Sequence, residues 1–187
     1  IVAKTLGINF YDKNLITLAA QKSGLSDEFI ANNEQRVRSG WMQNLAASAA
    51  YSNGFFSGQY LPLSESIFIS EAQVIRDIAA KESAVIVGRC ADYVLRDDPN
   101  AALVNLFVHA PMAARIRRES ARTNTTPIQA EKRIRQVDKE RASYYNFFSS
   151  KRWGDAQGYD LCINTGNMDI SDVVQLTLRY LELRGLR

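Results

Sequence analysis

The sequence predicts an α/β fold in which helices cover both faces of a parallel sheet. Short apolar segments such as Ala84–Val87 and Leu103–Val108 have the composition of strands, and amphipathic segments of helical period separate them. Strands that alternate with helices in this way are typical of parallel sheets. With 187 residues, of which 46% are hydrophobic, the chain suits one domain with a small inserted lobe.

The N-terminal part of the chain begins with a predicted helix over residues 1–6, for which Gly7 is the C-cap. A short strand over residues 8–11 follows, and a second helix begins near Asp12. Residues 34–63 are rich in Ser, Asn, Gln, Gly and aromatic residues with weak periodicity, which predicts a mobile insert. A further helix then begins at Ser64 and ends near residue 79.

The C-terminal part contains three more predicted helices and a last strand. Pro111 suits the first turn of one helix, and Thr126 precedes a long basic one. The strand covers Leu161–Ile163, and the final helix begins near Ser171. Five residues form the apolar side of that helix: Val173, Val174, Leu176, Leu178 and Leu181.

Positive charge is concentrated in one segment. The whole chain has a net charge of +3, but Arg115–Arg152 holds 11 Lys/Arg against 4 Asp/Glu, a net +7, which leaves −4 for the remainder. Such a segment is either a solvated helical face or a site for a polyanion, which can be nucleic acid or the phosphates of a nucleotide.

The composition disfavours several classes of protein and site. Cys90 and Cys162 are too few for a disulfide scaffold and lie in or beside apolar runs, so we expect two reduced, buried thiols in a cytoplasmic protein. His109 is the single histidine, so no metal site is expected, and a structural role for it is favoured over a ligand contact. No apolar run approaches the roughly 20 residues of a membrane-spanning helix.

Arg89 stands directly after a predicted strand, in the segment SAVIVGRCAD. Ligands of open parallel sheets bind at the carboxyl ends of the strands, so Arg89 leaves the sheet where a ligand would bind, and Gly88 permits a tight turn. The alternative is an arginine that pairs with Asp92 or Asp97 and fixes the loop.

A second candidate site lies in the basic helix, where Asp138 is three residues from both Arg135 and Arg141. On neighbouring turns of a helix, the carboxylate can hold both guanidinium groups, whose forks can then grip phosphate oxygens. Phosphoryl transfer requires such cations because charge builds up on the transferred group. The alternative is an ordinary ion-paired surface helix.

Four segments occur in an order and at a spacing that resemble a known family. They are YDKNLI, VIVGRCADYVL, RIRQVDKERASYY and WGDAQGYDLCINT. Together they resemble the cytidylate kinase-like family of P-loop proteins, and the resemblance spans nearly the whole chain.

The resemblance implies a P-loop NTPase fold of the adenylate kinase type, whose parallel sheet has the strand order 2-3-1-4-5. Residues 1–187 would form a single kinase-like domain, with a monophosphate-binding lobe over 26–64 and a basic lid over 115–152. ATP and Mg²⁺ would be held by a Gly-rich phosphate loop. The chain contains no GxxxxGK[ST] pattern and begins after the position of that loop and of the first strand, so we expect the natural protein to start upstream of Ile1.

The resemblance also implies roles for individual residues around the acceptor. Arg89 matches an arginine that grips the monophosphate, and Arg76 resembles another phosphate-contacting arginine. Cys90 stands where cytidylate kinases carry an Asp associated with recognition of the nucleotide, which leaves cytidine specificity open. Asp92 is the candidate substitute for that acid, and Asp12 lies where the monophosphate lobe begins.

In the lid, Asp138 and Arg141 match the second half of the family pattern, whereas Arg135 is one place out of register. These residues, with Arg133, would close over the transferred phosphoryl group. The expected function is ATP-dependent phosphoryl transfer to a nucleoside monophosphate, cytidylate or a related small acceptor. The alternatives are a non-catalytic nucleotide-binding regulator and a nucleic-acid-binding module that uses the basic 115–152 segment.

The expected partner is a nucleotide substrate; a membrane is not expected and nucleic acid is disfavoured. The aromatic residues of 41–60 can stack on a base, form the core of the inserted lobe or contact a second copy of the chain in a homodimer.

Overall fold

The computed structural model describes residues 1–12 and 63–186. The predicted helix near Asp12, the mobile insert and the aromatic residues of 41–60 lie outside the described residues, as does almost all of the lobe predicted over 26–64.

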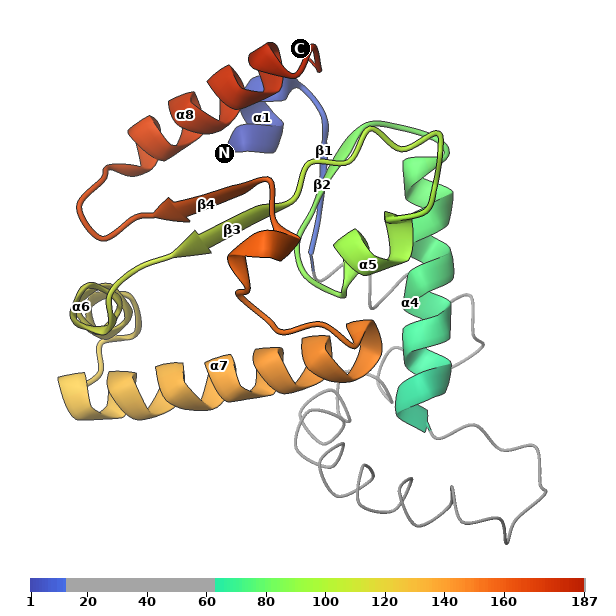
Figure 1. The fold of residues 1–187 in the computed structure, drawn as a ribbon. Coiled ribbons are helices and arrows are strands. Elements are labelled where there is room, and N and C mark those ends of the chain that lie inside the picture. Colours follow the sequence, from blue (N-terminus) through green and yellow to red (C-terminus); the bar gives the residue numbers. More distant parts are fainter. Residues whose placement is uncertain (13–62, 187) are drawn as a thin grey trace, which may run out of the picture. The chain divides into compact units, whose positions relative to one another are not determined.

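The chain divides into two compact units. Unit 1 comprises Ile1–Gly7 and Pro99–Arg187, and unit 2 comprises Ile8–Asp98. Each unit contains one two-stranded parallel sheet together with its own helices (Figure 1). The predicted α/β class and the parallel pairing of the strands are therefore confirmed. The single-domain organisation and its lobe and lid boundaries stay predictions.

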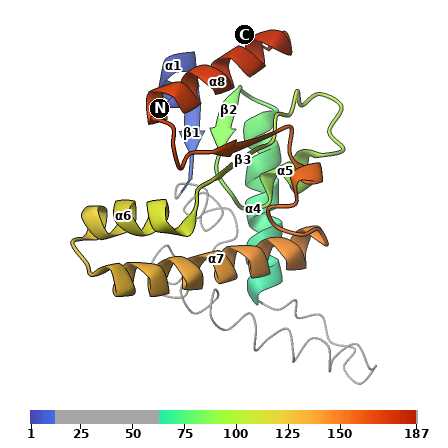
Figure 2. The same ribbon diagram turned by 60° about the vertical axis from the view of Figure 1, so that its left-hand side comes forward.

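Unit 1 is built on the parallel pair β3 (Leu106–His109) and β4 (Leu161–Asn164), with Phe107 opposite Cys162 and His109 opposite Asn164. Both ribbon views place α1 and α8 on one side of this pair and the α6–α7 hairpin on the other (Figures 1 and 2). The helical elements of unit 1 are α1 (Val2–Leu6), α6 (Met112–Thr123), α7 (Pro127–Ser149), the 3₁₀ helix η1 (Ala156–Gly158) and α8 (Ile170–Leu183).

The ends of these helices follow local sequence rules. α1 ends at Gly7, whose φ of 70° lies in the left-handed region that glycine adopts without steric cost, as predicted. α7 begins with a capping box, because the Thr126 side chain accepts a hydrogen bond from the Gln129 backbone N–H and the Gln129 side chain accepts one from the Thr126 backbone N–H. Pro127 occupies the first helical turn, where its missing N–H costs nothing.

Unit 2 is built on the parallel pair β1 (Asn9–Tyr11) and β2 (Ala84–Ile86), with Phe10 opposite Val85. The helices of this unit are α4 (Leu63–Ala79) and α5 (Ala91–Leu95). Glu82, just before β2, accepts hydrogen bonds from the side chains of Asn9 and Tyr11. These bonds tie the two strands together beyond their backbone ladder.

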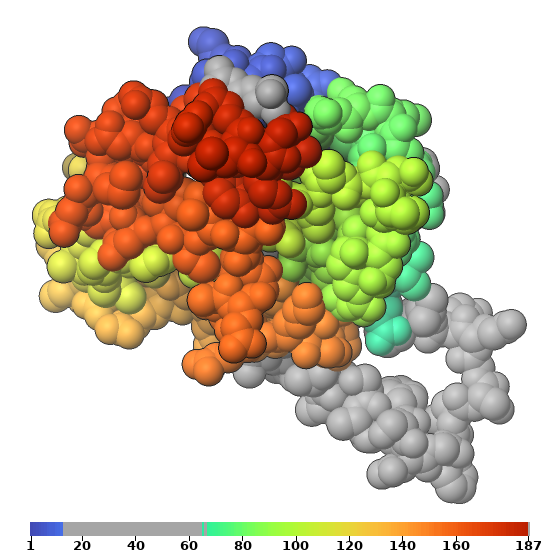
Figure 3. Space-filling model, turned by 45° about the horizontal axis from the view of Figure 1, so that its top comes forward, coloured from blue at the N-terminus to red at the C-terminus, as the bar shows by residue number. Residues whose placement is uncertain are grey.

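Three details differ from the sequence predictions. β3 begins at Leu106, three residues later than predicted. Cys162 is exposed, not buried, because it lies on the opposite face of β4 from the buried Ile163. Leu176 is 41% exposed, because at helical spacing it points away from the buried side of α8, where Thr177 lies instead. The space-filling view shows α8, in red, at the surface of the molecule (Figure 3).

Within the part of the chain that the structure describes, no helix is both long enough and apolar enough to cross a lipid bilayer.

The capping box makes a testable contribution to stability. We expect Thr126→Ala to lower the free energy of unfolding by about 1 kcal/mol, because the first turn of α7 loses a hydrogen-bond acceptor. Thr126→Ser keeps the hydroxyl and should remain near wild type. Urea denaturation followed by circular dichroism measures both variants, and equal stability of the Ala and Ser variants would contradict the assignment.

Candidate functional site

The carboxyl end of β2 leads into a turn of unusual conformation. Gly88, Arg89 and Cys90 have φ angles of 78°, 56° and 55°, so three successive residues adopt left-handed backbone geometry. For each of the two non-glycine residues this geometry costs about 1 kcal/mol. The turn leads directly into α5, and the backbone N–H of Val94 donates to the Cys90 carbonyl. Such strain is common at ligand sites.

The Arg89 side chain is held by a carboxylate from the neighbouring helix α4. Its Nε lies 3.3 Å from Oε1 of Glu71. The side chain of Glu71 is 1% exposed and that of Arg89 is 16% exposed, so the ion pair is largely withdrawn from water. An ion-pair partner of Arg89 is thus Glu71 of α4, an acid that is distant from Arg89 in the sequence.

Cys90 is buried beneath the same turn and is 3% exposed. Burial raises the pKa of its thiol to about 12, and the nearby negative charges of Asp92 and Glu71 add to this shift, whereas Arg89 opposes it. The side chain is therefore a neutral thiol at ordinary pH. It cannot supply the negative charge that an Asp would bring to this position.

The other acceptor-side candidates lie around the same unit. Asp92 is half-buried in the first turn of α5, Arg76 is exposed in the last turn of α4, and Asp12 is exposed directly after β1. The roles predicted for these residues stay predictions.

In unit 1, Asp138 has a different partner from the two predicted, Arg135 and Arg141. Its carboxylate accepts two hydrogen bonds from Arg115 of α6, Nη1 to Oδ2 at 2.5 Å and Nη2 to Oδ1 at 2.7 Å. Asp138 raises the pKa of the Arg115 guanidinium, chiefly through these bonds. The expectation that Asp138 holds Arg135 is incorrect, since Arg135 donates instead to Glu131, one turn earlier on α7, at 2.6 Å.

A second ion pair of reversed polarity crosses between the same helices. Glu119 of α6 lies 3.3 Å from Nε of Arg133 on α7 and also accepts hydrogen bonds from Arg122. α6 therefore contributes the cation at one crossing and the anion at the other. We call the pairs Arg115–Asp138 and Glu119–Arg133 the α6–α7 clasp.

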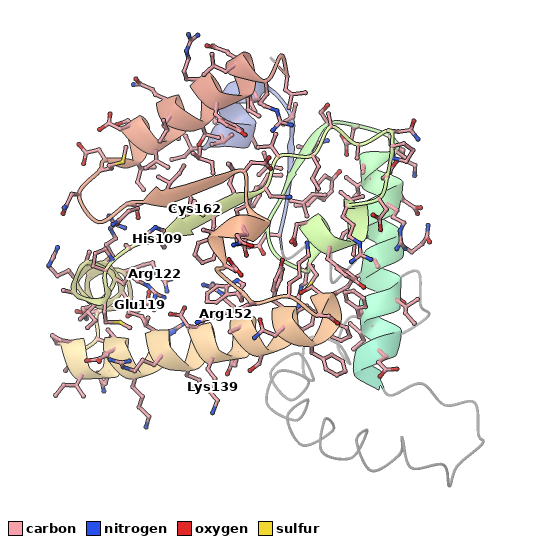
Figure 4. All side chains as sticks on the ribbon, in the orientation of Figure 1. His109, Glu119, Arg122, Lys139, Arg152 and Cys162 are labelled. Carbon is pink, nitrogen blue, oxygen red and sulfur yellow. The ribbon has the colours of Figure 1, made fainter. Side chains whose placement is uncertain are left out.

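The remaining predicted lid cations are accessible on α7. Arg135 and Arg141 are exposed, and Lys139 projects from the side of α7 away from the sheet (Figure 4). Exposure does not mean that all of these cations are unpaired, because Arg135 and Arg133 both form ion pairs with carboxylates.

A further arginine, Arg118 of α6, makes hydrogen bonds at the carboxyl ends of β3 and β4. Arg118 donates to Oγ1 of Thr165 at 3.0 Å and to the Thr165 carbonyl. Thr165 in turn donates from its backbone N–H to the His109 carbonyl at 2.8 Å. Phe107 of β3 packs against Trp153 and Tyr159, with ring centroids 5.4 and 4.9 Å away.

The sequence analysis overlooked three of these residues: Glu71, Arg115 and Arg118. Glu71 had a signal, because it occupies the apolar stripe of its helix at helical spacing from Phe68 and Ile75. An ionisable residue in such a stripe indicates a buried charge with a partner. Arg115 and Arg118 had no comparable signal, since their partners are 23 and 47 residues away.

Among the described residues, no group of three or more His, Cys, Asp or Glu side chains is placed to hold a metal ion.

Comparison with known proteins shows similarity to a family model, to curated proteins and to a solved structure. The model of a family described as "Cytidylate kinase-like family" matches residues 1–167. Proteins named cytidylate kinase from Saccharolobus islandicus strains Y.G.57.14 and Y.N.15.51 are each 29% identical over 117 residues. Each match covers 60% of this chain and 58% of the relative, so the chain matches little more than half of their length.

A solved structure also resembles the chain. It is a crystal structure of an uncharacterized protein from Eubacterium ventriosum ATCC 27560, with a TM-score of 0.69 and 26% sequence identity. The similarity covers 97% of this chain and 87% of that one.

The α6–α7 clasp predicts measurable coupling between the two helices. In a double-mutant cycle of Arg115→Ala and Asp138→Ala, we expect a coupling free energy of about 1–2 kcal/mol, because the pair is bidentate and partly buried. The exposed pair Arg135–Glu131 is the control, for which about 0.3–0.5 kcal/mol is expected. Urea denaturation of the single and double variants gives both values; equal coupling in the two cycles would contradict a special role for the Arg115–Asp138 pair.

The two cysteines should differ sharply in reactivity. At pH 8 we expect iodoacetamide to label Cys162 in the folded protein and to leave Cys90 unlabelled, because Cys90 is buried and its pKa of about 12 keeps it protonated. In urea both should react. Mass spectrometry of peptides reads the result, and rapid labelling of Cys90 in the folded state would show that the turn after β2 is open.

Proposed function

Because the chain belongs to the cytidylate kinase-like family, we propose that it takes part in ATP-dependent phosphoryl transfer to a nucleoside monophosphate or a related small phosphate acceptor. The observation that carries this proposal is the position of Arg89, in a left-handed turn at the carboxyl end of a parallel strand. A guanidinium at that place offers a planar fork of N–H donors that matches phosphate oxygens.

The fold forms part of the proposal. In the family strand order 2-3-1-4-5, strands 2 and 3 are neighbours and strands 4 and 5 are neighbours, with strand 1 between the two pairs. We propose that the pairs β1–β2 and β3–β4 of this chain correspond to these two neighbouring pairs. Both pairings occur in the adenylate kinase type of P-loop fold that we propose. The TM-score of 0.69 over 97% of this chain shows that a solved structure shares its fold.

Arg89 would bind the phosphate of the acceptor, with Arg76 as a second cation from α4 and with Asp12 and Asp92 contributing to the same side. Cys90 carries no charge at ordinary pH, so the site lacks an acid at the position that cytidylate kinases use. The proposal therefore names a class of phosphate acceptors that includes cytidylate, and it does not single out cytidylate as the substrate.

Arg135 and Arg141 of α7 would neutralise charge on the transferred phosphoryl group, which is the main requirement of phosphoryl transfer. Asp138 would act differently from the sequence prediction. Its bidentate bond to Arg115 fixes α7 against α6, so it would orient the lid cations through the helix that carries them.

Kinases of this family use ATP as the phosphoryl donor, with Mg²⁺ to neutralise its phosphates. Among the described residues, no cluster of metal-ligating side chains is present. The roles that we propose for the described residues are binding of the acceptor and placement of cations around it.

A nucleic-acid-binding role for 115–152 is the weaker candidate. Arg115, Arg122, Arg133 and Arg135 all pair with carboxylates, which reduces the positive charge available to a polyanion. A non-catalytic nucleotide-binding regulator would keep the same site and would differ only in the absence of turnover.

A transfer assay on the natural full-length protein tests the proposal. With ATP, Mg²⁺ and a panel of CMP, UMP, AMP and GMP, we expect turnover of at least one acceptor. Arg89→Ala should lower kcat/KM for that acceptor roughly 10- to 100-fold, since a charged hydrogen bond to phosphate is lost.

Arg96→Ala is the matched control, because Arg96 lies in the same segment, is exposed and pairs with Asp97. It should keep wild-type kinetics. Nucleotide binding without turnover of any acceptor would favour the regulator, and polynucleotide binding that weakens steeply with salt would favour the nucleic-acid module. Full activity of Arg89→Ala would remove the role proposed for Arg89.

A further inference from the structure

Glu71 is an ionisable residue in the most buried part of α4. With Ile75 it is one of the two largest side chains that are fully buried among the described residues. Its neighbours on the helix face, Val74 and Ile78, are buried apolar residues. An ionised carboxylate in such surroundings is costly unless a cation compensates it, and an apolar residue of similar size would pack there without that cost. Packing alone therefore does not account for a Glu at this position.

The cation that compensates Glu71 is the same arginine that the proposed function assigns to the acceptor phosphate. The contact is made at Nε of Arg89, at 3.3 Å. A carboxylate 3.3 Å from Nε attracts the planar guanidinium and favours one rotation of it, and with that rotation one direction of the two Nη groups. The base of the side chain is set separately by the left-handed turn of Gly88–Cys90. Arg89 is thus restrained at both ends.

We propose that Glu71 is a positioning residue that orients the Arg89 guanidinium for the phosphate of the acceptor; this inference rests on the proposed function. A long arginine side chain loses rotamer entropy when it is ordered by a ligand. With Glu71 in place, that ordering occurs on folding, so the acceptor meets a cation that is already directed. The same carboxylate also repels a phosphate. Removing its charge should therefore weaken acceptor binding if Glu71 orients Arg89, and should strengthen acceptor binding if repulsion is its only effect.

Isothermal titration calorimetry on the natural full-length protein tests the inference with CMP, UMP, AMP, GMP and inorganic phosphate as probes, and with ATP as the reference ligand. Glu71→Gln keeps the shape of the side chain and removes its charge. We expect it to weaken binding of the acceptor nucleotide roughly 10- to 100-fold, as loss of a charge-assisted contact does, and to leave ATP affinity unchanged.

The double variant Glu71→Gln/Arg89→Ala should bind the acceptor no more weakly than Arg89→Ala alone, because Glu71 acts through Arg89. Glu65→Gln is the matched control: it is the same substitution on the same helix, at a half-buried residue of the first turn, and should bind like wild type. Should Glu71→Gln not fold, as judged by circular dichroism, Glu71→Asp keeps the charge and shortens the reach, and it should show the same selective loss.

The outcomes separate the inference from the proposed function. If the wild-type protein binds none of the phosphate probes, the acceptor role of Arg89 fails and the inference fails with it. If Arg89→Ala weakens acceptor binding but the Glu71 variant binds equally well or more tightly, the proposed function stands and the positioning role is overturned. Equal losses for acceptor and ATP, accompanied by a lower unfolding midpoint, would assign Glu71 a structural role only.

Discussion

A buried carboxylate that must have a cation beside it is the constraint on which the turn after β2 depends. Glu71 cannot be placed in the interior of unit 2 as an isolated charge, so Arg89 must reach it. The left-handed turn of Gly88–Cys90 starts the Arg89 side chain in that neighbourhood, and the strain of the turn is offset by the contacts that it makes possible. The buried neutral thiol of Cys90 is a consequence of the same tight turn.

In unit 1 a related principle applies between the two helices α6 and α7. The α6–α7 clasp alternates in polarity, with Arg115 as the cation of one pair and Glu119 as the anion of the other. Such an arrangement favours one register of α6 on α7, because sliding either helix by a turn would bring like charges together. The exposed cations of α7 are thereby presented on a fixed support. Local pairing such as that of Arg135 with Glu131 adds little stability by comparison.

Periodicity and turn chemistry predicted most of the described elements, because these signals are local. Gly7 ends α1, Thr126 caps α7 and the apolar spacing of Val173, Val174 and Leu178 identifies the buried side of α8. Burial predicted from composition was wrong where one face of a strand or helix is buried and the other is exposed. Cys162 and Leu176 are apolar residues that fall on outward faces, and an apolar residue in the sequence does not by itself indicate which face it occupies.

The sequence by itself determined the α/β class, the parallel character of the strands, the family resemblance and the placement of Arg89 at a strand end. These properties follow from patterns within a few residues or from ordered motifs. Only the tertiary structure decided which charges meet. Asp138 takes Arg115 and not Arg135, and Arg89 takes Glu71 from another helix, because the partner of a charge is chosen by distance in space and by burial. Spacing along one helix reports neither quantity.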